Sequence, residues 1–276
     1  MTEVQTEQGV QARKIGNVEG LGDIYRIDAL PLDRQITVCE AVGIGHPYLP
    51  DVSEAARIRL AGVSDNWTRT SIVPVAVKGA RTMLTKSPLL MNLIMAGLAV
   101  KAHRRGEYLE IPGIYDVVRQ IAEQESGKEP EDRTALAVSQ EGDFNLTPES
   151  EVARFLFERA NSAYFGNKTN GTIPFFNLST DSMGGVANYL WFRYPRDRSF
   201  LGCRGGGLGG GCGAFGVRRV SSGEASAENS GYSLTEIARA HSTTIPAVLK
   251  DIGLGALGEL VTRPLAKGLM EKLRGQ

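Results

Sequence analysis

The chain has 276 residues, which is enough for one large domain or for one domain with a smaller appendage. Hydrophobic residues make up 42% of it and charged residues 22%, as in ordinary globular proteins. Because 31 basic and 31 acidic side chains cancel, composition argues against a uniformly basic nucleic-acid-binding protein and against an acidic disordered tail.

Cysteine use and hydropathy point to an intracellular protein. Three cysteines (Cys39, Cys203 and Cys212) are too few for a secreted disulfide scaffold. Cys203 and Cys212 could pair or bind a metal, but with no CxxC motif and no nearby histidine we expect small thiols, no metal and no cofactor. The first residues have no apolar signal segment, and the apolar run 88–100 is too short to cross a bilayer unaided. We therefore expect a cytoplasmic location and no membrane partner.

The net charge of zero conceals alternating blocks of charge. The blocks carry −5 over residues 1–56, +8 over 57–105, −8 over 106–160, +5 over 161–221 and zero over 222–276. Such blocks could form separate faces, one for a polyanion and one for a neighbouring subunit. They could equally intermix in space and cancel.

In the first half of the chain we expect two strands and then helices. Residues 22–29 and 33–42 alternate between apolar and polar and are rich in β-branched and aromatic side chains, which predicts strands. Residues 43–50 contain two glycines and two prolines and predict a loop. Residues 77–84 predict the start of a helix that is broken at Pro88 and continues to about Arg105.

Further along, residues 113–124 have the apolar spacing of a helix. Thr147, followed by Pro148, is predicted to begin the next helix. Residues 173–178 and 188–194 predict strands. Strands at both ends, helices between them and a late glycine-rich hairpin predict an α+β fold.

Glycine is concentrated in residues 202–216, where it occupies nine of fifteen positions. The tract matches neither a dinucleotide-binding nor an ATP-binding motif. Glycine lets backbone amides approach a phosphate, and Arg204, Arg218 and Arg219 lie within or next to the tract, which suits a nucleic-acid backbone. A surface loop with no ligand is an equal alternative.

A second segment of interest is Ser71–Leu84. If it opens a helix, Lys78 and Arg81 share a face near the helix N-terminus, which suits a phosphate. The alternative is a pair of solvated cations on an amphipathic helix.

Together the two segments resemble motifs of the RAMP superfamily of CRISPR-associated proteins. The first motif is matched by Val73, Pro74 and Val77–Arg81, and the second by Gly209–Gly211, Gly213 and Phe215–Val217. Val75 and Ala76 stand where the family has a Gly-Ser-Ser turn, and one residue is missing before the lysine.

This resemblance implies a ferredoxin-like (RRM-like) core with helical insertions over residues 1–221. It implies a backbone subunit of a CRISPR effector complex, which oligomerises along a guide RNA. The implied partners are guide RNA, complementary target nucleic acid, further copies of the chain and other effector subunits. The implied RNA-binding residues are Arg57, Arg59, Arg69, Lys78, Arg81, Arg204, Gly209, Gly210, Gly211, Arg218 and Arg219.

Some subunits of this kind cut target RNA with an aspartate in a loop before the first motif. The candidates here are Asp51 and Asp65. Neither lies in a recognisable form of that loop, so we do not expect cleavage.

The C-terminal part is expected to be a separate appendage. Residues 222–231 predict a linker, and residues 232–276 predict a small helical segment. Tyr232–Leu254 has the pattern of a helix-turn-helix but few cations, which favours a subunit contact over DNA reading. The alternative functions are a ligand-responsive DNA-binding regulator that uses this segment, or an enzyme built on the glycine tract.

Overall fold

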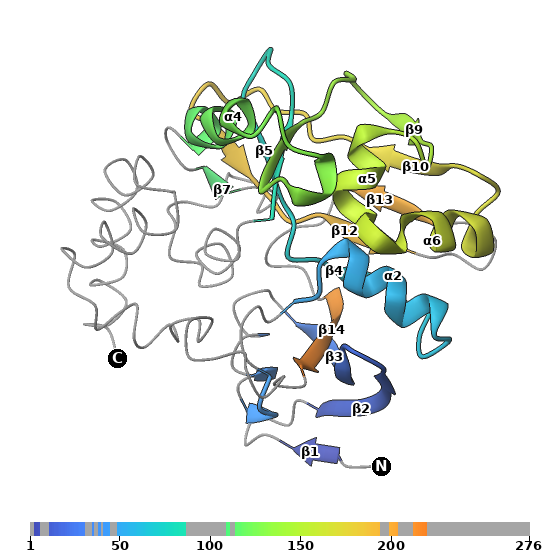
Figure 1. The fold of residues 1–276 in the computed structure, drawn as a ribbon. Coiled ribbons are helices and arrows are strands. Elements are labelled where there is room, and N and C mark those ends of the chain that lie inside the picture. The colour runs from blue at the N-terminus through green and yellow to red at the C-terminus, as the bar shows by residue number, and fades with distance from the viewer. Residues whose placement is uncertain are drawn as a thin grey trace, which may run out of the picture.

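The computed structural model describes most of the chain up to residue 219. The described residues are 3–5, 11–30, 35, 38–39, 41–44, 49–86, 109–110, 114–193, 199–203 and 212–219. They form three small β-sheets, named here sheets A, B and C, with few helices packed among them (Figure 1).

Sheet A joins the beginning and the end of the described chain. Its strand order is β1 (Glu3–Gln5), β2 (Gln11–Val18), β3 (Gly22–Leu30) and β14 (Cys212–Arg219), and every pair is antiparallel. β14 also approaches sheet B, because the Phe215 backbone N–H donates to Thr68 Oγ1 at 3.1 Å.

Sheet B contributes residues to a large core cluster. Its order is β4 (Thr68–Arg69), β12 (Trp191–Arg193), β13 (Phe200–Gly202), β10 (Ile173–Phe176) and β9 (Phe144–Leu146). Only the β10–β13 pair is parallel among these four pairings. Side chains on adjacent positions of a strand point to opposite faces, so the sheet has two chemically different faces.

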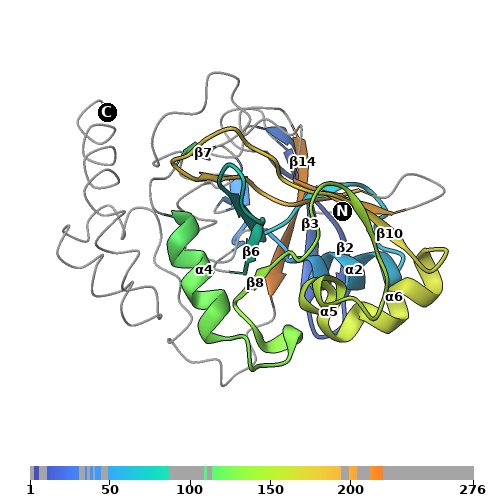
Figure 2. The same ribbon diagram turned by 90° about the horizontal axis from the view of Figure 1, so that it is seen from above.

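Sheet C contains the segment that resembles the first family motif. Its order is β7 (Leu109–Glu110), β11 (Val186–Ala187), β5 (Val73–Ala76), β6 (Met83–Thr85) and β8 (Ala135–Ala137), all antiparallel. Helix α4 (Ile114–Gln124) packs beside β6 and β8 (Figure 2).

The largest core cluster connects the helices with sheet B. It includes residues of α2 (Val52–Leu60), of α5 (Glu151–Phe157) and of α6 (Asn161–Lys168). Two 3₁₀ helices, η1 (Pro130–Asp132) and η2 (Glu158–Ala160), contact α5. A smaller cluster around Ile58 joins α2 to sheet A.

Several predicted elements are confirmed. The strand expected over residues 22–29 is β3, and the helix expected over 113–124 is α4. The strands expected over 173–178 and 188–194 are β10 and β12, although both are shorter than predicted.

Other predicted elements are wrong. Residues 77–84 form a turn and then strand β6, not a helix, because Gly79 adopts φ +74° and reverses the chain. The described residues within 33–42 that have regular structure are helical, not extended. Helix α5 begins after Ser150 and not after Thr147, since the Ser150 Oγ accepts the Ala153 N–H at 3.2 Å.

The prediction of a ferredoxin-like core is also wrong. That fold needs the order βαββαβ, with a single antiparallel sheet covered by two helices. The described residues instead place their strands in three sheets, and β10 and β13 of sheet B are parallel.

No helix in the described part of the chain is long and apolar enough to cross a membrane. The linker 222–231 and the appendage 232–276 lie outside the described residues.

Candidate nucleic-acid interface

Sheet B has one face buried in the core and one face rich in aromatic side chains. Phe175, Phe192 and Leu201 are fully buried in the core cluster that includes α5 and α6. The neighbouring positions Phe176 and Trp191 point to the opposite face, since both are in register with Gly202 of β13.

We define the aromatic face by Phe176, Trp191, Arg193 and Phe200. The Phe176 and Trp191 rings are 6.2 Å apart and nearly parallel, and Phe200 stands edge-on to Trp191 at 5.1 Å and to Phe176 at 5.6 Å. The Arg193 guanidinium carbon lies 5.5 Å from the Phe200 ring centroid. The three rings are partly exposed and Arg193 is exposed, so the face combines aromatic surface with a cation.

Gly202 makes room for the Trp191 ring. A Cβ atom at Gly202 would lie 2.1 Å from Cζ2 of Trp191, far inside van der Waals contact. The missing side chain therefore allows the indole to lie over strand β13 next to Phe176.

Replacing Gly202 with alanine should displace the indole and lower the free energy of unfolding by about 1–3 kcal/mol, because overpacking forces side chains off their rotamers. Thermal unfolding of the variant measures this. Gly166→Ala on helix α6 is the matched control: nothing lies within 4 Å of its Cβ position, so the change should be neutral or slightly stabilising. Equal unfolding temperatures for the two variants would contradict the packing described for Trp191.

The strands of the aromatic face belong to a basic part of the chain. Residues 161–221 carry a net charge of +5, and Arg196, Arg198 and Arg204 lie in the segments directly before and after β13. Aromatic side chains beside cations bind single-stranded nucleic acid, because bases stack on the rings and phosphates pair with the cations.

A small polar pocket lies at the turn between β5 and β6. It encloses about 150 Å³ and is lined by three chain segments, residues 76–82, 140–142 and 177–180. Every residue of the motif Val77–Arg81 except Lys78 lines the pocket, and Lys78 and Arg81 are exposed. The turn therefore keeps these two predicted RNA-binding residues at the surface, although it does so without a helix.

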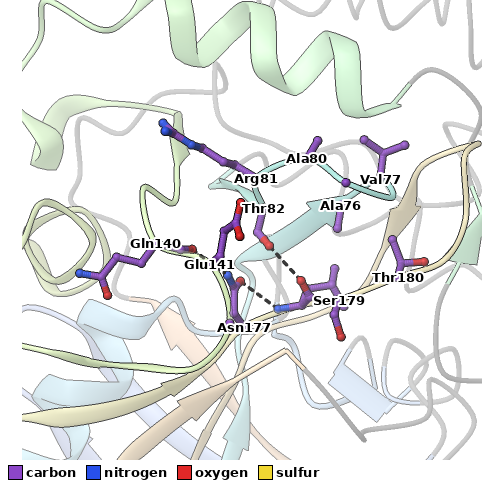
Figure 3. A pocket seen from close by; sticks show the side chains of 13 residues that line it. Ala76, Val77, Ala80, Arg81, Thr82, Gln140, Glu141, Asn177, Ser179 and Thr180 are labelled. Carbon is purple, nitrogen blue, oxygen red and sulfur yellow. Dashed lines mark hydrogen bonds between the residues drawn. The ribbon is translucent and has the colours of Figure 1, made fainter.

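Asn177 connects two of the three walls of the pocket (Figure 3). Its backbone N–H donates to Asp143 Oδ1 at 3.1 Å, its side-chain Nδ2 donates to the Gln140 carbonyl at 3.3 Å, and its Oδ1 accepts the Leu178 N–H at 2.9 Å. Thr82 Oγ1 donates to the Leu178 carbonyl at 3.0 Å, which ties the turn to the same segment.

Two of the predicted RNA-binding arginines are fully buried, and this corrects their predicted role. Arg59 donates to the backbone carbonyls of Ala55, Asn66 and Phe192 at 3.2, 2.9 and 3.0 Å. Its guanidinium carbon lies 3.8 Å from the Phe192 ring centroid, and burial lowers its pKa to about 10. Arg69 donates to the Leu30 carbonyl at 2.9 Å. Neither side chain has surface with which to contact a phosphate.

Arg57 and Arg218 are accessible but already engaged. Arg57 Nη2 donates to the Glu19 carbonyl at 2.8 Å. Arg218 pairs with Asp23 at 2.9 Å, and Asp23 also pairs with Lys14 at 2.7 Å. The hydrogen bonds from Lys14, Asn17 and Arg218 hold the pKa of Asp23 well below its usual range.

The two candidate catalytic aspartates lie in unrelated structural environments. Asp51 caps α2, where its Oδ1 accepts the Glu54 N–H at 2.7 Å and its own N–H donates to Glu54 Oε2 at 3.1 Å. Asp65 pairs with Lys168 at 3.5 Å. The structure does not bring these aspartates together in one site.

Asp51 belongs to a cluster of charged groups from several elements. Burial of its carboxyl group and the nearby Glu54 carboxylate raise its pKa to about 7, and Glu158 adds to the effect while Lys86 opposes it. Lys86 Nζ pairs with Glu158 at 2.6 Å. Glu158 has φ 49°, the only positive value among the described non-glycine residues, so its backbone is strained where it meets this cluster.

The second family motif is only partly described. Arg204 and Gly209–Gly211 lie outside the described residues, and Arg219 is the last residue of β14. Phe215, Gly216 and Val217 are buried in sheet A. A Cβ at Gly216 would lie 2.3 Å from Ile44 Cδ1, so this glycine serves packing between β14 and Ile44.

No protein-family model matches the chain, and no curated protein matches it at a significant level. One solved structure, described as "Accommodation of massive sequence variation in Nanoarchaeota by the C-type lectin fold", is similar over 76% of this chain and 98% of that chain, with a TM-score of 0.47 and 12% sequence identity. A similarity at this level assigns neither fold nor function.

Among the described residues no group of three or more His, Cys, Asp or Glu side chains is placed to hold a metal ion.

Proposed function

We propose that the chain binds single-stranded RNA on the aromatic face of sheet B. The observation that carries this proposal is the cluster of Phe176, Trp191 and Phe200 rings with Arg193 beside them. Stacking on an aromatic ring contributes about 1–3 kcal/mol per base and tolerates any base sequence. Arg193, which is exposed, supplies charge for the phosphates.

Binding of RNA also agrees with what the two family motifs in the sequence imply. The finer form of the proposal is a backbone subunit that oligomerises along a guide RNA in the cytoplasm, with target nucleic acid and other effector subunits as partners. This finer form rests on the two motifs alone, because the ferredoxin-like core that they implied is not the architecture of the described residues. Electron micrographs of the protein with RNA would test it, since a backbone subunit forms RNA-dependent filaments.

Titration of a labelled single-stranded oligouridylate tests the binding surface. Trp191→Ala should weaken binding by roughly 5- to 150-fold, which corresponds to the loss of one stacked base. Arg193→Ala should reduce the slope of log K against log salt by about 0.7, as expected for one lost phosphate contact to a single strand.

Two controls separate binding from stability. Phe144→Ala removes a partly exposed ring that packs on Phe175, on the buried side of the same sheet, and should leave RNA affinity unchanged. Lys128→Ala removes an exposed cation paired with Glu125 and should leave the salt slope unchanged. Equal RNA affinities for wild type and Trp191→Ala, or binding that does not depend on salt, would overturn the proposal.

A further inference from the structure

The pocket at the β5–β6 turn and the aromatic face are adjacent in sequence. Phe176 is the last residue of β10, and Asn177, the next residue, forms a wall of the pocket. The two Cα atoms are ~3.8 Å apart across a trans peptide. The Cys203 N–H donates to the Phe176 carbonyl at 2.9 Å and Asn177 is fixed by Asp143, so the junction is held on both sides.

The size of the pocket suits one group of a larger ligand. Sites that hold a whole small molecule usually enclose about 300–1,000 Å³. This pocket encloses about 150 Å³, which is too small for a complete nucleotide. Its volume suits a single sugar ring.

The lining of the pocket is chemically suited to hydroxyl groups. Glu141, Ser179 and Thr180 bring a carboxylate and two hydroxyls to its walls, whereas the Gln140 side chain extends away from Asn177 (Figure 3). A carboxylate accepts hydrogen bonds from neutral hydroxyls but repels a phosphate. Figure 3 shows Glu141 beside Thr82 and Asn177, whereas the Arg81 side chain extends away from them. This cation is therefore placed for a phosphate at the rim and not inside the pocket.

We propose that this pocket binds a ribose of the RNA strand through its 2′-hydroxyl, so that the chain selects RNA over DNA. The inference rests on the proposed function, because the strand must first stack on the aromatic face. The 2′-hydroxyl is the group that distinguishes the two nucleic acids at a given site. Hydrogen bonds to a charged group contribute about 1.5–3 kcal/mol, which corresponds to a preference of roughly 10- to 150-fold.

The test compares labelled oligouridylate with oligodeoxyuridylate of the same length. Wild type should bind the RNA at least about 10-fold more tightly. Glu141→Ala should reduce this RNA-to-DNA ratio to near one. The ratio is the readout because loss of a negative charge also changes the affinity for both strands. Glu149→Ala removes an exposed carboxylate outside the pocket and should leave the ratio unchanged.

The two proposals fail in different ways. Equal affinities of wild type for the two strands, both weakened by Trp191→Ala, would overturn the ribose pocket and leave the aromatic face standing. A wild-type preference for RNA that Glu141→Ala does not reduce would also overturn it. Absence of binding to either strand would overturn the proposed function, and the pocket inference with it.

Discussion

Replacing Arg59 with alanine should lower the free energy of unfolding by about 3–5 kcal/mol. The Arg59 guanidinium satisfies carbonyls of Ala55, Asn66 and Phe192, so it joins helix α2, the segment after it and strand β12. Its removal leaves buried acceptors without their donor and deletes the stacking contact with the Phe192 ring. Urea-induced unfolding measures the loss.

Arg57→Ala is the matched control for this experiment. Arg57 lies on the same helix, is partly exposed and donates a hydrogen bond of 2.8 Å to the Glu19 carbonyl. Its loss should change the free energy of unfolding by about 0.5–1.5 kcal/mol. Arg59→Met keeps an apolar stem and should be destabilised almost as much as Arg59→Ala. Similar stabilities for the Arg57 and Arg59 variants would show that the buried guanidinium is not a structural link.

Replacing Asp51 with asparagine should raise the free energy of unfolding relative to wild type, and this gain should be larger at pH 8 than at pH 5. The folded-state pKa of Asp51 is raised to about 7, above its ordinary value of 3.8, because the carboxyl group is buried beside Glu54. Between pH 3.8 and about pH 7 the folded protein therefore binds up to one more proton than the unfolded chain, and its stability falls as the pH rises through this range. Because one pKa unit corresponds to ~1.4 kcal/mol, this fall is at most about 4 kcal/mol.

Asparagine is a good N-cap and carries no charge, so the variant keeps the cap and loses the titration. The difference in unfolding free energy between Asp51→Asn and wild type should grow by up to ~3 kcal/mol from pH 5 to pH 8, measured by urea unfolding at each pH. Asp181→Asn, at an exposed position, should follow wild type across the range. A difference that stays constant, or that shrinks at higher pH, would contradict the assignment of this titration to Asp51.

Local patterns in the sequence predicted some of the local elements. Helix α4 follows from the spacing of Ile114, Val118 and Ile121, and β3 and β10 follow from runs of β-branched and aromatic residues. The turn at Lys78–Arg81 was predicted as a helix because its side chains also suit a helix start. What decides against the helix is the pairing of β5 with β6, which places Val75 opposite Met83.

The candidate interface could not be predicted from local patterns. Phe176, Trp191 and Phe200 come from three strands, and only the register of sheet B shows that their rings share a face. The strand Trp191–Arg193 was expected, but not the parallel pairing of β10 with β13 that completes the face. The signal available in the sequence was the run of aromatic residues at 175–176 and 191–192, which alternates between core and surface.

Charge counting likewise failed to separate binding cations from structural ones. Arg59 and Arg69 contribute to the +8 of residues 57–105, yet both are buried. Burial of an arginine depends on carbonyls supplied by distant segments, such as Phe192 for Arg59 and Leu30 for Arg69. These contacts are set by tertiary structure and have no signature in the local sequence.

Trp191 fluorescence gives the most direct measurement of RNA binding on the aromatic face. The chain has two tryptophans, Trp67 and Trp191, so Trp67→Phe leaves Trp191 as the single reporter. Oligouridylate should quench the Trp191 emission, because a base stacks on the indole. The titration should saturate, and its dissociation constant should equal the one measured with labelled RNA. RNA that binds without any change in Trp191 emission, or no binding at all, would contradict the account.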